Sequence, residues 1–276
     1  MRKLTLQVTF TLLSTVLFAQ AQIGEKPPYD FESPDQIYVL PDYLEEVSAL
    51  TYYQPNQLAM LNDEHGRMYV YDLSKMEIVH RVRFHGDGDF EGIERVGDFI
   101  YAIESTGKMH RFNIHMEGVV EAIKTPFDKK NNVEGLGYDH VNNRLLIGLK
   151  GSGDVKNIDV KGKAVYSFDF ATDEFDKLPA YVILNKDLER VVGDDFRFSP
   201  SGVAVHPLTG EVYVLSAVKN ALIIFSNEGK PKNLTRLGKR LFPQPEGITF
   251  SPNGDLFISN EIDSDGGTIL KFSQKN

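Results

Sequence analysis

The chain has 276 residues, no cysteine and a formal net charge of −9 at pH 7. The lack of cysteine excludes disulfides and a lipid anchor on a cysteine, so packed side chains must hold the fold together. An acidic chain without a block of Lys or Arg argues against binding to nucleic acid or to anionic lipid.

The first residues predict export. Arg2 and Lys3 form a short basic start, residues 4–18 are mostly apolar, and Ala19-Gln20-Ala21 fits the small-x-small rule for cleavage. We therefore expect a signal peptide over residues 1–21, an extended leader over 22–35 and one β domain over 36–276. An uncleaved membrane anchor is the alternative for the first segment, and no later stretch is apolar enough to span a bilayer.

After the leader, one short phrase recurs five times, typified by Glu134-Gly135-Leu136. The copies start 45, 43, 67 and 45 residues apart, at Glu46, Glu91, Glu134, Ser201 and Glu246. A second apolar run follows each copy. A period of this length, made of short β segments, is typical of propeller blades. The sequence therefore predicts an all-β fold, a single β-propeller of five four-stranded blades.

The strands in chain order support a closed ring. Residues 36–40 predict an isolated strand, and five groups of strands follow over residues 47–84, 92–125, 135–184, 202–237 and 247–273. The last group is one strand short. We expect the N-terminal strand to pair into this last blade, because that closes the ring and covers both free sheet edges.

The third repeat is the long one. An insertion over residues 151–162, an acidic loop over 173–176 and the segment 185–198 account for its 67-residue spacing. A sixth, degenerate blade is the alternative. We disfavour it, because the gap holds no second Glu-Gly phrase and no spare set of four strands.

The repeated Glu indicates where chemistry can occur. The innermost strand of a propeller blade lines the central channel, and its entry end opens on the face that usually binds ligands. Four blades would aim a carboxylate at one height around the channel: Glu46, Glu91, Glu134 and Glu246. The ends of the next strands, where Lys150 and Ser216 also lie, add three further candidate ligands: Asn62, Glu104 and Asn260.

Carboxylates that converge on a channel need a cation, a raised pKa or wide, water-filled spacing. Oxygen ligands without cysteine favour a hard ion, so Ca²⁺ is the expected cofactor, although Lys150 could instead neutralise part of the ring. In the purely structural interpretation, each Glu accepts hydrogen bonds from backbone amides of the next blade. A catalytic role is the third possibility.

Catalytic residues are not assigned. The sequence has no Gly-x-Ser-x-Gly elbow, no phosphate loop and no His-Glu-x-x-His zinc motif. A tetrahedral zinc site would have to be assembled from distant turns, and the spacing of the seven His residues does not reveal one.

The same segments carry a family resemblance. Residues 45–52, 61–64, 89–93 and 245–248 together resemble the SdiA-regulated family of bacterial envelope β-propellers, with Ala49 where that family usually has Gly. Phytase-like esterase and regucalcin/gluconolactonase propellers are similar in pattern, and the latter hold a channel-mouth metal through Glu, Asn and Asp. The resemblance implies a periplasmic or cell-envelope propeller, with membrane association possible and no settled activity. Lys150 departs from an all-oxygen metal ring, which argues against a lactonase-type catalytic metal.

Two function hypotheses follow. The first is an exported, monomeric, non-enzymatic propeller that binds a cation, Ca²⁺ above all, and presents its channel mouth to an unknown envelope ligand or protein. The second is a metal-dependent hydrolase of a phosphoester, ester or lactone. An envelope scaffold that binds no small molecule is the third interpretation.

Overall fold

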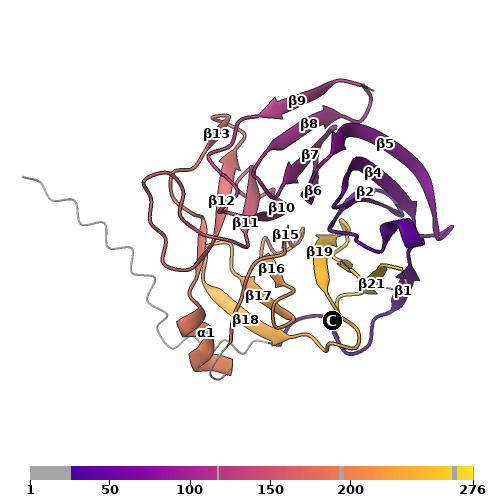
Figure 1. The fold of residues 1–276 in the computed structure, drawn as a ribbon. Helices are drawn as coiled ribbons and strands as arrows, with labels where there is room; N and C mark the ends of the chain where they lie inside the picture. Colours follow the sequence, from indigo (N-terminus) through magenta and orange to yellow (C-terminus); the bar gives the residue numbers. More distant parts are fainter. Residues whose placement is uncertain (1–25, 117, 193–195, 263–265, 276) are drawn as a thin grey trace, which may run out of the picture.

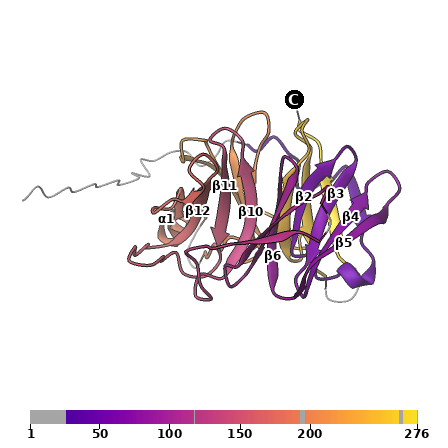
Figure 2. The ribbon, with the colours of Figure 1, turned by 90° about the horizontal axis from the view of Figure 1, so that it is seen from above.

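The computed structural model describes residues 26–116, 118–192, 196–262 and 266–275. They form five antiparallel sheets arranged as a ring (Figure 1). Seen edge-on in Figure 2, the strands run between the two faces of the ring. This confirms the predicted five-bladed β-propeller. The expected signal peptide over residues 1–21 lies outside the described residues.

The first two blades follow the expected order of strands from the axis outward. The first comprises β2 (Ala49–Gln54), β3 (Gln57–Asn62), β4 (His65–Asp72) and β5 (Glu77–Asp87). The second comprises β6 (Phe90–Val96), β7 (Phe99–Glu104), β8 (Met109–Asn113) and β9 (Val120–Ile123).

The other blades repeat this order. The third is built on β10 (Val133–Asp139), β11 (Arg144–Leu149) and β12 (Lys163–Asp169), with β13 (Glu174–Phe175) and β14 (Tyr181–Ile183) both paired to β12. The fourth has β15 (Gly202–Val205), β16 (Val212–Ser216), β17 (Ala221–Phe225) and β18 (Pro231–Arg236). The fifth has β19 (Pro245–Phe250), β20 (Leu256–Asn260), β21 (Thr268–Phe272) and β1 (Gln36–Val39).

The N-terminal strand closes the ring, as predicted. β1 runs antiparallel to β21, with Gln36 opposite Lys271 and Val39 opposite Thr268. The preceding segment is also attached, since Tyr29 and Phe31 are buried against the side chains of the fourth and fifth blades. The Tyr29 hydroxyl donates a hydrogen bond to the Gly254 carbonyl at 2.7 Å. Residues 29–31 therefore contribute to the core, although the sequence indicated only an extended leader.

The long third repeat holds no sixth sheet among the described residues. Its extra length goes into β13, β14, the loop after β11 and one element that the sequence did not reveal, the helix α1 (Asn185–Val192). α1 lies on the outside of the ring beside β18 (Figure 1), where the Arg236 side chain donates to the Val192 carbonyl at 3.2 Å. In the part of the chain that is described, no helix is long and apolar enough to cross a membrane.

The core consists of apolar layers between neighbouring sheets. Each layer joins side chains of adjacent blades, as where Tyr101 of β7 packs with Leu145 of β11. The innermost strands contact one another in a closed order, β2 with β6, β6 with β10, β10 with β15, β15 with β19, and β19 with β2. The fold therefore brings the start of every innermost strand to the same end of the axis.

Candidate functional sites

The repeated Glu lies at an irregularity of the sheet. The pairing register shifts at the Glu-Gly step in β6, β10 and β19. Glu91, Glu134 and Glu246 each lie inside such a shift. A bulge turns the local backbone and re-aims a side chain, so the three Glu side chains leave the normal alternation of their strands.

The repeated Gly lets the innermost strands approach. A Cβ at Gly202 would lie 2.5 Å from the Glu246 carbonyl oxygen, and one at Gly135, where φ is +82°, would lie 2.8 Å from the Gly202 Cα. Only Gly fits such contacts without displacing the backbone of the next blade. The Gly therefore allows the backbones of neighbouring blades to approach closely beside the Glu side chains.

Four carboxyl groups and one amine interact electrostatically there, and we call them the acidic cluster: Glu91, Glu134, Glu246, Glu261 and Lys150. Burial, followed by repulsion from Glu134, raises the pKa of Glu91 to about 10. Burial likewise raises the pKa of Glu134 and of Glu246 to about 7. Burial and then the charge of Glu246 raise the pKa of Glu261 to about 8.

Lys150 is the cation of this cluster. Its Nζ lies 2.9 Å from Glu134 Oε1, which also accepts a hydrogen bond from Asn132 Nδ2 at 2.9 Å. The net pKa of Lys150 is raised. Burial alone would lower this pKa, but the negative charges of Glu134 and Glu246 have the larger combined effect. Lys150 therefore stays charged and, among the described residues, it is ion-paired with Glu134 alone of these carboxyl groups.

Two buried oxygens beside the cluster have no hydrogen-bond partner among the described residues. They are Glu134 Oε2 and Asn260 Oδ1, and both residues are buried. Asn260 pairs across the sheet with Pro245, the neighbour of Glu246. Its Nδ2 donates to the Leu241 carbonyl and to Thr268 at 3.2 Å each, which fixes the amide. The free oxygens are acceptors that a cation or a ligand donor can satisfy.

Glu46 and Asn62 lie in a different environment. The Glu46 side chain is exposed, and the charge of Asp63 is the main cause that raises its pKa. Both residues line a polar cavity of about 310 Å³ that also contains Arg67 and Arg81. Asn62 Oδ1 accepts from the Glu64 amide at 3.1 Å, so part of its role is local structure.

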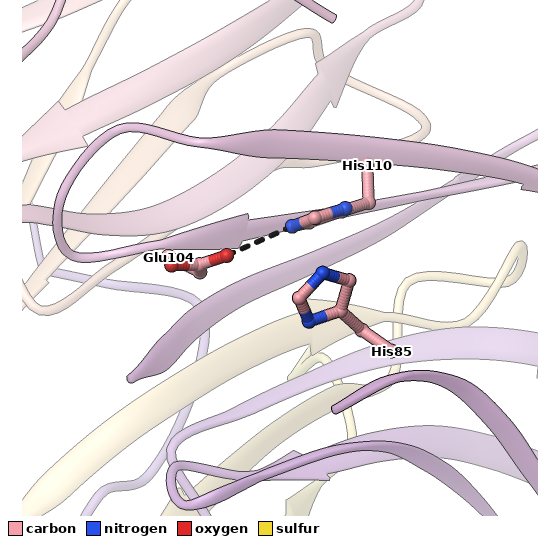
Figure 3. Close-up of side chains that lie close together, drawn as sticks. All are labelled: His85, Glu104 and His110. Carbon is pink, nitrogen blue, oxygen red and sulfur yellow. Dashed lines mark hydrogen bonds and ion pairs between the residues drawn. The ribbon is translucent and has the colours of Figure 1, made fainter. Parts of the chain in front are cut away.

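Glu104 joins two histidines instead of the acidic cluster, and we call this group the histidine cluster: His85, Glu104 and His110 (Figure 3). One ligand atom from each lies within 4.8 Å of the other two. Glu104 Oε1 and His110 Nε2 are hydrogen-bonded at 2.9 Å, and the ring of His85 is centred 4.5 Å from that of His110. Three ligating groups with this spacing can hold a metal ion.

Three strands of two blades build the histidine cluster. Glu104 ends β7, His110 lies on β8 after a tight turn in which Gly107 has φ +86°, and His85 comes from β5 of the first blade. Phe84 and Phe90 pack against the His110 ring. The net pKa of Glu104 is lowered. Burial alone would raise this pKa, but the hydrogen bond from His110 and the charge of Lys108 together have the larger effect. Glu104 is therefore an anion at neutral pH.

The sequence-predicted candidates thus separate into groups. Glu91, Glu134 and Glu246 interact, with Asn260 beside them. Glu46 and Asn62 line the polar cavity, although the charge of Glu46 still contributes to the raised pKa of Glu261. Glu104 belongs to the histidine cluster. Sequence reasoning missed His85 and His110, because three strands contribute the cluster and no motif marks it.

Another missed residue is Glu94 on β6, which accepts from Thr51 Oγ1 at 2.7 Å and from the Tyr138 amide at 3.3 Å. Glu94 joins three blades.

The fold is shared with distant solved structures. Myxococcus xanthus glutaminyl cyclase is similar with a TM-score of 0.59 and 11% identity, over 87% of this chain and 95% of that one. A luciferin-regenerating enzyme is similar with a TM-score of 0.53 and 12% identity, again over 87% and 95% of the two chains. Identities this low show a common fold and nothing of activity.

No curated protein matches the sequence significantly. The family model described as SdiA-regulated, however, matches residues 35–263, which is most of the chain. The match covers the ring from its closing strand to the fifth blade and agrees with the resemblance carried by the Glu-containing segments. The chain belongs to the SdiA-regulated family.

Proposed function

We propose that this protein is an exported cell-envelope propeller whose acidic cluster binds a divalent cation, Ca²⁺ above all, and through it an envelope ligand or partner. One observation carries the proposal. Four carboxyl groups, buried or partly buried, share Lys150 as their cation, and their pKa values are raised. Protons or a bound cation must supply the missing positive charge.

The donor set supports a hard ion. Carboxylate and amide oxygens are the ligands that Ca²⁺ prefers, and Glu134 Oε2 and Asn260 Oδ1 are buried without a partner among the described residues. Over the same residues, no three carboxylates of the acidic cluster bring ligand atoms within 4.8 Å of one another. An ion there would be held by one or two carboxylates and would complete its shell with oxygens of water or of a ligand. That coordination suits ligand binding.

A metal-dependent hydrolase of a phosphoester, ester or lactone is the second candidate. The observation that favours it is the pKa of about 7 for Glu134 and Glu246. A general acid or base works best with a pKa near the working pH. The bound cation would polarise the substrate, and one of these two carboxyl groups would transfer the proton.

Thermal unfolding tests the cation proposal. The purified protein is melted at pH 8 in EDTA and then with an excess of Ca²⁺, Mg²⁺, Mn²⁺ or Zn²⁺. Binding at a hundred times the Kd adds about 2.7 kcal/mol, and for a chain of this size each kcal/mol raises Tm by about 2–4 °C. We expect Ca²⁺ to raise Tm by several degrees and Mg²⁺ to raise it less.

Two matched variants locate the effect. Glu246→Gln is expected to lose the Ca²⁺ response, whereas Glu77→Gln, on the exposed outer strand β5, is expected to keep it. A wild-type Tm that does not respond to Ca²⁺ would show that the repeated Glu is structural. An equal response in both variants would place the ion elsewhere.

A further inference from the structure

We propose that the histidine cluster is a second metal site, which binds a transition-metal dication of the Zn²⁺ type through His85, Glu104 and His110 and keeps one coordination position open. The site lies where the first and second blades meet, with His85 on β5 and with Glu104 and His110 on β7 and β8. It is independent of the acidic cluster, because its ligands, its preferred ion and its strands are different.

The ligand chemistry selects the ion. Two imidazole nitrogens and one carboxylate oxygen suit Zn²⁺ and its neighbours, whereas Ca²⁺ takes oxygen ligands almost exclusively. Zinc sites with two His and one Glu as protein ligands are known, and in such sites the fourth coordination position is left for water or a substrate. Ca²⁺, the cofactor expected from the sequence, therefore does not fit this cluster.

The geometry needs little adjustment. Zinc bonds of 2.0–2.1 Å in a tetrahedron place ligand atoms roughly 3.3 Å apart. Glu104 Oε1 and His110 Nε2 now lie 2.9 Å apart, so they must separate by a few tenths of an ångström. His85 must approach from within 4.8 Å. Its side chain is exposed, and a small rotation at the rim costs little.

The surroundings hold the carboxylate in a ligating position. The other oxygen, Glu104 Oε2, lies 3.4 Å from Lys108 Nζ and accepts from Thr106 Oγ1 at 3.3 Å. These contacts leave Oε1 directed at the histidines. In metal sites, residues that hydrogen-bond to a ligand commonly hold it in its ligating orientation in this way. The buried pair of Glu104 and His110 forms the floor of the site, and exposed His85 forms its entrance.

The experiment titrates the purified full chain with Zn²⁺ by calorimetry, in a chelator-free buffer with millimolar Ca²⁺ to occupy oxygen-only sites. We expect one Zn²⁺ per chain, with an affinity at least tenfold lower in His85→Gln. Because His85 is exposed, this variant is expected to fold. His80→Gln removes an exposed histidine of the same strand β5 and is expected to bind as the wild type does.

His65→Gln is the second control. His65 lies 3.1 Å from Asp87 and 3.9 Å from Glu64 on the surface, so it is the competing place for an adventitious ion. A loss of Zn²⁺ binding in His65→Gln with retention in His85→Gln would overturn the proposal. So would the absence of binding in the wild type, or equal affinity in the wild type and His85→Gln.

Co²⁺ substitution tests the open position. The Co²⁺-loaded wild type is expected to show the intense visible bands of a four-coordinate ion, and azide is expected to shift them by taking the fourth position. His80→Gln should give the same bands, and His85→Gln should lose them. The weak spectrum of a six-coordinate ion, or bands that azide does not change, would contradict a three-ligand site.

Discussion

The acidic cluster and the histidine cluster use ionisable groups in opposite ways. In the acidic cluster, burial and mutual repulsion raise the pKa of every carboxyl group, and Lys150 compensates only part of the charge. In the histidine cluster, Glu104 is buried as well, yet His110 and Lys108 outweigh burial and lower its pKa. Burial alone therefore does not decide the charge of a carboxyl group; the balance with neighbouring donors does.

The two regions also differ in origin. Three members of the acidic cluster, Glu91, Glu134 and Glu246, occupy equivalent positions of a repeat, so the ring brings copies of one residue together. The histidine cluster is made of residues that occur once, at the junction of two blades. A repeat supplies like charges and needs a counter-ion, whereas a junction can combine unlike groups that satisfy one another.

The largest expected effect is the removal of Lys150, the cation that is paired with Glu134. Lys150→Met leaves buried Glu134 without its partner. Breaking a fully buried pair costs about 3–5 kcal/mol, and we expect a loss towards or below the lower end because the Lys150 side chain is 34% exposed. The loss should be greater at pH 8 than at pH 5, because Glu134, with a pKa of about 7, takes up a proton at the lower pH. Denaturant unfolding at both pH values measures it.

Lys108→Met is the matched change at the histidine cluster. Lys108 is also paired with a carboxylate, but its side chain is 70% exposed. Exposed pairs contribute about 0–1 kcal/mol, so little stability should be lost. Equal losses in the two variants would show that Lys150 is screened by solvent and that the acidic cluster is not a low-dielectric site.

A medium effect is expected from Glu246→Gln, and its sign depends on pH. The pKa of Glu246 is raised from 4.5 to about 7 in the folded state, so the native protein holds a proton that the unfolded chain releases. Stability should fall as pH rises from about 4.5 to about 7. In EDTA at pH 8 the variant should match or exceed the wild type, by on the order of 1–3 kcal/mol, with no gain at pH 4.5.

Glu104→Gln should do the opposite. In EDTA at pH 7 it replaces a charged acceptor of His110 by a neutral one, and hydrogen bonds to charged groups contribute about 1.5–3 kcal/mol. We therefore expect a loss of stability in denaturant unfolding, whereas Glu246→Gln gains. A gain in both variants would mean that the Glu104 carboxylate is as poorly compensated as the acidic cluster.

The same contrast explains what the sequence could reveal. The repeat predicted the five blades, and the missing strand at the end predicted the pairing of β1 with β21. Both depend on the periodic backbone. The position of Glu91, Glu134 and Glu246 follows from the same period, because each lies near the start of an innermost strand at the same end of the axis. The remaining copy of this Glu, Glu46, is exposed and lines the polar cavity instead.

Features without a period could not be predicted. His85, Glu104 and His110 meet because β5 extends to Asp87 and passes beside β8 of the next blade, and nothing in their spacing records that contact. The core role of Tyr29 was hidden for a similar reason, since it packs against blades some 200 residues later in the chain. The helix α1 was missed because it is only eight residues long and lies outside the repeat.

The smallest expected effect concerns the link between the two regions. Ser105 follows Glu104, and its hydroxyl donates to Asp89, whose charge raises the pKa of Glu91 and of Glu134. Ser105→Ala removes one hydrogen bond at a cost of about 1 kcal/mol. If the clusters are independent sites, the Ca²⁺-induced rise in Tm and the Zn²⁺ affinity should each change less than about twofold, because neither ion is held by Ser105 and couplings between separate sites are small. Titration of this one variant with both ions measures the link. A parallel loss of both responses would show instead that Asp89 couples the clusters into a single two-metal site.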